Sequence, residues 1–165
     1  MVREHEAKFK KLFNTSHQCI MLANGQGDLL EFNNTLGQFL RDEATSFAGQ
    51  KIWECDFWAT EMDRQLVQVA FSEVALGKNV PVVVSITGKK SKTRVLDMTV
   101  SLVSLGEDQS PLVVLEGKDI TSILKANEAL LESELRLKSA QKIAHLGNWE
   151  WDILSNELLW SDEIY

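Results

Sequence analysis

One apolar, strand-like segment of this chain runs without a break into a long helical pattern, and this continuity constrains the fold most strongly. Residues 112–117 are mostly apolar, and they lead through Asp119 and Thr121 into a charge-rich stretch with helical spacing. The side-chain oxygens of Asp119 and Thr121 can accept hydrogen bonds from the unpaired N–H groups of a helix's first turn. We therefore expect a strand that delivers its end directly into a helix, so that strain in the sheet can reach that helix.

Four further segments carry strand patterns. Residues 18–23 and 29–32 flank a turn rich in Asn, Gly and Asp, which predicts a hairpin. Residues 82–86 are β-branched and continuous, and after a turn the segment 93–103 alternates apolar with polar side chains. That alternation predicts one buried and one wet face of a sheet.

Short helical patterns separate these strands. An N-terminal helix has an apolar side, and either Asn33 or Asn34 can cap the helix that follows the first hairpin. Thr60 and Asp63 have the spacing of a capping box and open a helix to about Gly77, whose expected buried stripe is Leu66, Val67, Ala70, Phe71 and Val74. The order of elements predicts an α+β fold with a five-stranded antiparallel sheet, helices packed on one face, and a long C-terminal helix.

Composition limits the function classes. A chain of 165 residues supports one well-buried domain with an appendage, and a net charge of -7 argues against nucleic-acid binding. The basic cluster of Lys89, Lys90, Lys92 and Arg94 is expected to be a solvated hairpin tip. No apolar run is long enough to span a bilayer and the N-terminus lacks the apolar core of a signal peptide, so we expect a cytoplasmic segment without membrane contact.

No catalytic or metal-binding motif stands out. The three histidines, His5, His17 and His145, have no neighbouring nucleophile and acid in a recognisable arrangement. Cys19 and Cys55 are not spaced as zinc or redox ligands, and both are expected to be buried small hydrophobes. We expect no catalytic residues, no metal site and no enzymatic activity.

Several motifs, taken in order, resemble a PAS domain. Residues 25–33 are similar to that family's first hairpin and helix start, and residues 47–50 resemble its central glycine turn. The Trp53-Glu54 pair with Phe57-Trp58 is similar to a bacterial sensor subclass, and residues 115–121 resemble the Asp-Ile-Thr exit of that subclass. The resemblance implies the PAS fold and a role in signal transduction.

The resemblance also divides the chain. We expect an N-terminal helical cap at residues 1–15, a PAS domain at 16–121 and a signalling helix or coiled-coil linker at 122–146. Residues 147–165 resemble the opening hairpin of a second PAS domain, cut short, which implies a longer multidomain receptor.

The long helix has two competing apolar stripes and flanking charges. A helix folded back on its own sheet and a parallel two-chain coiled coil with a weak register are both open, and we favour the coiled coil. A homodimer is therefore expected, with contacts from two helices; the expected residues are Phe9, Leu12, Phe13, Ile123, Leu130 and Leu137.

The ligand is left undetermined by the sequence. Candidate contacts for a small molecule are Trp53, Trp58, Phe71, Met98 and Asn33, and the aromatic members could stack on a noncovalent flavin. The family resemblance disfavours His-ligated haem, because residues 63–77 contain no histidine, and Cys55 lacks the sequence context of photoadduct flavin relatives.

The expected function is a sensory and dimerisation module of a histidine kinase or diguanylate cyclase. Asp119 and Thr121 would couple a small ligand or redox state to an output domain of the same chain. Two alternatives stay open: a ligand-free PAS spacer whose cavity is filled by its own side chains, and a flavin-dependent redox sensor.

Overall fold

The computed structural model describes residues 2–40, 46–88, 92–104, 110–143, 149–152, 155 and 157–160. By its internal contacts the chain divides into two compact units, Met1–Thr121 and Ser122–Tyr165. The first unit contains α1 (Val2–Thr15), β1 (Cys19–Asn24), β2 (Leu29–Phe32), α2 (Asn34–Leu40), the 3-10 turn η2 (Ile52–Glu54), α3 (Glu61–Val74), β3 (Val80–Gly88), β4 (Lys92–Val103) and β5 (Leu112–Asp119).

The five strands form one antiparallel sheet in the order β2-β1-β5-β4-β3. The first and last strands of the unit therefore lie side by side at its centre, where Met21 is opposite Leu115. β5, the strand that leads into the long helix, therefore pairs with β1 of the first hairpin and with β4 of the second. The predicted α+β fold with a five-stranded antiparallel sheet is confirmed.

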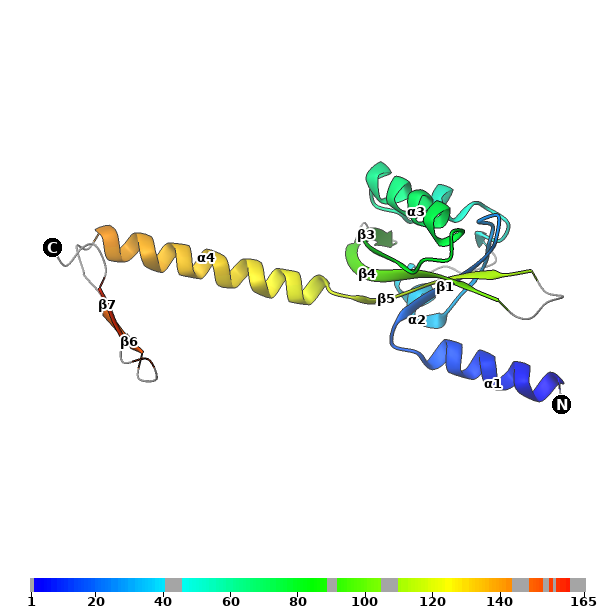
Figure 1. Cartoon of the computed structure of the whole chain (residues 1–165), viewed down its shortest axis with the longest axis horizontal. Coiled ribbons are helices and arrows are strands. Elements are labelled where there is room, and N and C mark those ends of the chain that lie inside the picture. Colours follow the sequence, from blue (N-terminus) through cyan, green and yellow to red (C-terminus); the bar gives the residue numbers. More distant parts are fainter. Residues whose placement is uncertain are drawn as a thin grey trace. The chain divides into compact units, whose positions relative to one another are not determined.

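One face of the sheet is buried by helices. In β3 the side chains of Val82, Val84 and Ile86 are buried, whereas Val83 between them is 54% exposed. α3 lies along the covered face and contacts β3 and β4 (Figure 1). The period-two alternation of the sequence thus becomes a core side and a solvent side.

α3 begins with the predicted capping box. The Thr60 side chain accepts a hydrogen bond from the Asp63 backbone N–H, and the Asp63 carboxylate accepts one from the Thr60 backbone N–H in return. The expected buried stripe is confirmed at four positions and wrong at Leu66, which is 39% exposed. Leu66 lies at the margin of the stripe, on a side of the helix that is partly open to solvent.

Both edges of the sheet are covered by other parts of the chain. Along β3, the Ala59 N–H donates to Ser85 O at 2.9 Å, and the Ser85 N–H donates to the Asp63 carboxylate at 2.8 Å. Along β2, the Leu29 N–H donates to Gln50 O at 2.8 Å. Edge strands otherwise present unpaired backbone groups, and these bonds satisfy a part of each edge.

The second unit contains α4 (Thr121–Ile143, with Thr121 at the boundary) and a hairpin of β6 (Trp149–Asp152) and β7 (Glu157–Trp160). The strands pair in register, with Trp149 opposite Trp160. The predicted helix to residue 146 is described to Ile143, and the next five residues lie outside the described part. Lys89 and Lys90 of the predicted basic tip also lie outside it.

Candidate ligand site and exit joint

The strand-to-helix joint is tied to the neighbouring strand β4 by two hydrogen bonds. The Thr121 hydroxyl oxygen accepts from the Val95 N–H at 2.9 Å, and the Ile120 N–H donates to Val95 O at 2.9 Å. The Asp119 carboxylate accepts from the Thr121 N–H at 2.9 Å and from the Thr121 hydroxyl. The expected acceptor role of Asp119 at the helix start is therefore present in the structure, although the role of either residue in signalling stays a prediction.

Arg94 completes this joint, and the sequence interpretation missed it. Its guanidinium forms an ion pair with the other oxygen of Asp119 at 3.0 Å, and it stacks over the Phe39 ring with 4.3 Å between the guanidinium carbon and the ring centroid. Arg94 is exposed, as predicted, but it lies within β4 rather than at the tip of the hairpin, and its guanidinium is paired. The alternation along β4 could have indicated this position, because Arg94 lies on the same face of the strand as Leu96 and Met98, which are buried.

Asn33 is fully buried and its amide is fully used. Its oxygen accepts from the Ile20 N–H at 3.1 Å and the Leu36 N–H at 3.3 Å, and its nitrogen donates to Phe13 O at 3.1 Å and Gln18 O at 2.8 Å. Asn33 rather than Asn34 therefore caps α2. These bonds exhaust its donors and leave the predicted ligand contact without support from the geometry.

The aromatic candidates are packed on protein side chains. Trp58, Phe71 and Met98 belong to the main core cluster, and the Trp58 indole N–H donates to Ile52 O at 2.6 Å. Trp53 is half-buried and meets Phe71 edge-to-face, with the ring centroids 5.4 Å apart. Their contact with a ligand stays a prediction, and each already stabilises the core by burial.

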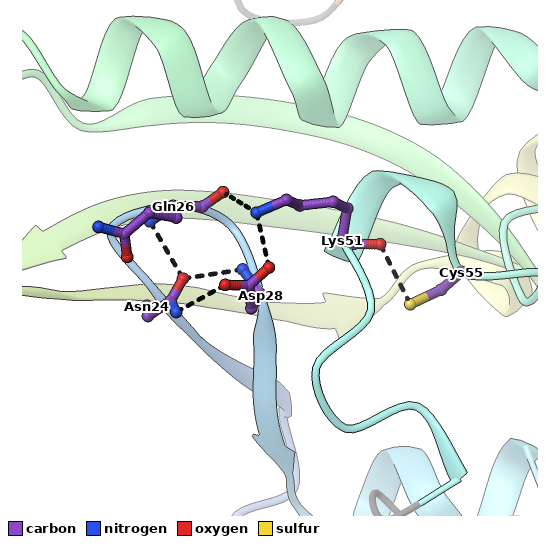
Figure 2. A network of polar contacts seen from close by, with 5 residues as sticks. All are labelled: Asn24, Gln26, Asp28, Lys51 and Cys55. Carbon is purple, nitrogen blue, oxygen red and sulfur yellow. Dashed lines mark hydrogen bonds and ion pairs between the residues drawn. The ribbon is translucent and has the colours of Figure 1, made fainter.

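The first hairpin turn is bound to the segment before η2 by a network of polar contacts, which Figure 2 shows. Lys51 donates to Gln26 O at 2.9 Å and pairs with Asp28 at 2.6 Å, while the Asn24 oxygen accepts from the Gln26 and Asp28 N–H groups. Hydrogen bonds from Lys51 and Asn24 lower the pKa of Asp28. The network fixes the turn to the segment that leads into η2.

The first hairpin turn requires glycine at position 27, for two reasons. Its φ is +89°, and a Cβ there would lie 2.2 Å from the Trp53 ring. A side chain at position 27 would therefore meet both backbone strain and a direct clash with Trp53. The glycines in the sequence predicted the turn but not its contact with Trp53.

A pocket of about 470 Å³ lies apart from the predicted ligand contacts. It opens between the end of α2, the segment 46–57 and the end of β3; its lining residues are Leu40, Ser46, Phe47, Gln50, Glu54, Asp56, Phe57, Thr87 and Gly88. None of the five predicted ligand contacts lines it. Phe47, Gln50, Glu54 and Phe57 of the lining belong to the motifs quoted above, but the sequence did not indicate that they meet the ends of α2 and β3 around a pocket.

Two features limit other chemistry. Burial of the thiols, with a smaller effect from nearby acidic side chains, raises the pKa of Cys19 to about 11 and that of Cys55 to about 12. Neither thiol is therefore a ready nucleophile at neutral pH. Across the described residues, no three His, Cys, Asp or Glu side chains come together as metal ligands would.

The predicted dimerisation residues differ in exposure. Phe9 and Leu12 of α1 are more than half exposed, whereas Phe13 is 5% exposed and stacks on Phe9 with 5.5 Å between centroids. In α4, Ile123, Leu130 and Leu137 are also more than half exposed. Within the described residues, no helix combines the length and apolarity needed to cross a bilayer.

Comparisons with known proteins identify the fold. No protein-family model matches the sequence, and no curated protein matches it. Among solved structures, the PAS domain of an HTR-like protein from Haloarcula marismortui is similar with a TM-score of 0.59 and 17% identity, over 72% of this chain and 94% of that one.

Two further structures give the same result. The PAS domain of a protein from Colwellia psychrerythraea has a TM-score of 0.58 and 15% identity, over 74% of this chain and 99% of that one. A light-oxygen-voltage (LOV) protein of Rhodobacter sphaeroides has a TM-score of 0.56 and 11% identity, over 73% and 69%. The sheet and its helices therefore adopt the PAS fold, as the sequence motifs implied.

Proposed function

We propose that this chain is a sensory and dimerisation PAS module of a bacterial signal-transduction receptor, a histidine kinase or a diguanylate cyclase, without catalysis of its own. The observation that carries the proposal is the exit joint, where Thr121 is the first residue of α4 and also bonds to Val95 of β4. A displacement of the central strands must either move the start of the helix or break these bonds.

The proposed mechanism is a population shift. Ligand occupancy or redox state favours one position of β5, and Asp119 and Thr121 pass that position to the register of α4 in a homodimer. The exposed apolar residues of α4 support this arrangement, because a group of such side chains along one helix, Leu130 and Leu137 among them, favours a partner that covers it. An output domain of the same longer chain would read the register in the cytoplasm.

Two alternatives each rest on one observation. The burial of Trp58, Phe71 and Met98 supports a ligand-free spacer, since these side chains fill the interior themselves. The likeness to LOV proteins supports a noncovalent flavin, although Trp53 alone of the three predicted stacking residues has a partly exposed ring. His-ligated haem stays disfavoured, because α3 contains no histidine.

Replacement of Asp119 tests the proposal. In a receptor that joins this chain to a kinase or cyclase output domain, Asp119→Ala should uncouple output from signal while the domain stays folded. Asp97→Ala is the matched control, because Asp97 lies exposed on β4 outside the joint. Regulation by Asp119→Ala equal to that of the control would refute the coupling role.

Native mass spectrometry of the purified chain separates the alternatives. A dimer with a stoichiometric small molecule favours the sensor, and flavin absorbance of that molecule favours the redox sensor. A dimer that releases nothing favours the spacer. A monomer at micromolar concentration contradicts the dimerisation part of the proposal.

A further inference from the structure

The pocket beside α2 has a buried apolar floor. Leu40, Phe47 and Phe57 are each at most 9% exposed and form its base, and the two phenyl rings meet edge-to-face with 5.3 Å between centroids. A volume of about 470 Å³ lies within the usual range for small-molecule sites. The floor suits a ring or a short aliphatic body.

The rim of this pocket is acidic. Glu54 and Asp56 are exposed at the rim, and among the lining residues that the structure describes there is no Lys, Arg or His. Within the described part of the chain, neither carboxylate has an ion-pair partner. Carboxylates accept hydrogen bonds and attract positive charge, so an occupant must supply donors and is favoured when it is a cation.

The wall of the pocket also touches the residues that lead to the exit joint. Gly88 lines the pocket and packs so closely on α2 that an added Cβ would lie 2.6 Å from Phe39 O. The Arg94 guanidinium stacks on the Phe39 ring, and Arg94 forms an ion pair with Asp119. An occupant that displaces this wall therefore acts on the side chain that holds the joint.

We propose that this pocket binds a small organic cation with an apolar body and is the input site of the module. The role as input rests on the function proposed above, whereas the binding itself does not. The apolar body lies on Phe47 and Phe57, and the cationic group faces Glu54 and Asp56. Phe39 and Arg94 carry the displacement of the wall to Asp119.

A matched pair of probes tests the binding. 4-Phenylbutylamine and 4-phenylbutyrate share one apolar body and differ in charge, and each is titrated into the isotope-labelled chain to millimolar concentration while amide shifts are recorded. We expect saturable shifts at Gln50, Thr87 and Gly88 with the amine and none with the carboxylate. Equal binding of the two probes, or no saturable shift with either, would overturn the proposal.

Variants at the rim and a readout at the joint complete the test. The double variant Glu54→Gln/Asp56→Asn should weaken amine binding about fivefold, as expected for two exposed charge contacts, whereas Glu61→Gln on α3 should leave it unchanged. Shifts at Val95 and Thr121 on amine binding support the input role. Their absence overturns that role, and failure of both probes leaves the Asp119→Ala test of the proposed function intact.

Discussion

Replacing Asn33 by alanine is expected to destabilise the domain by about 3 kcal/mol, with no ligand present. The change removes hydrogen bonds to Ile20, Leu36, Phe13 and Gln18, at distances of 2.8 to 3.3 Å. Each is worth about 1 kcal/mol net, so four give about 4 kcal/mol. Water can replace the bond to Gln18, which is exposed, and this lowers the expected loss to about 3 kcal/mol.

Urea unfolding followed by far-UV circular dichroism measures this loss. Asn34→Ala is the matched control, because Asn34 is the adjacent residue of the same type and is exposed; its change should stay within about 0.5 kcal/mol. A loss below about 1 kcal/mol for Asn33→Ala would refute the reasoning, since it would mean that the four partners find other hydrogen bonds at little cost.

Three further outcomes follow from the described contacts. Burial raises the pKa of Cys19 to about 11 and that of Cys55 to about 12, so both thiols should resist alkylation at pH 8 until urea unfolds the chain. For the same reason the free energy of unfolding should fall as the pH rises above about 9 through these values, and melting experiments at a series of pH values measure this fall. Thr121→Val should speed hydrogen exchange of the Val95 amide about fivefold, because one bond of about 1 kcal/mol is lost; an unchanged rate would contradict the anchoring role. Asp63→Ala should lower the free energy of unfolding by about 2 kcal/mol in urea titration, because it removes the carboxylate half of the capping box of α3 and the acceptor for the Ser85 N–H at the β3 edge.

The sheet could be predicted because its signals are local. The alternation along residues 93–103 reports which side chains are buried, and the box of Thr60 and Asp63 marks the start of a helix. The run from residue 112 to Thr121 likewise shows where strand becomes helix. Each of these patterns depends on residues within a few positions of one another.

The candidate site depends on distant residues, and the sequence interpretation failed there. Phe39 and Arg94 meet only after the chain has folded, and Arg94 was assigned to a solvated tip because lysines precede it. Trp58 and Phe71 are residue types that often line ligand cavities, but here they are buried in the core. An aromatic side chain stabilises a protein by burial whether or not a ligand is near, so composition alone does not separate the two roles.

The covered edges of the sheet restrict how this module can assemble. The backbone groups that β-strand addition would require are bonded at Ser85 on one side and at Leu29 on the other. At these positions a second copy, or a following domain, cannot continue the sheet and must contact side chains or the helices. Assembly through side chains rather than backbone makes the partner's identity a matter of a few exposed residues, which single substitutions can change without disturbing the fold.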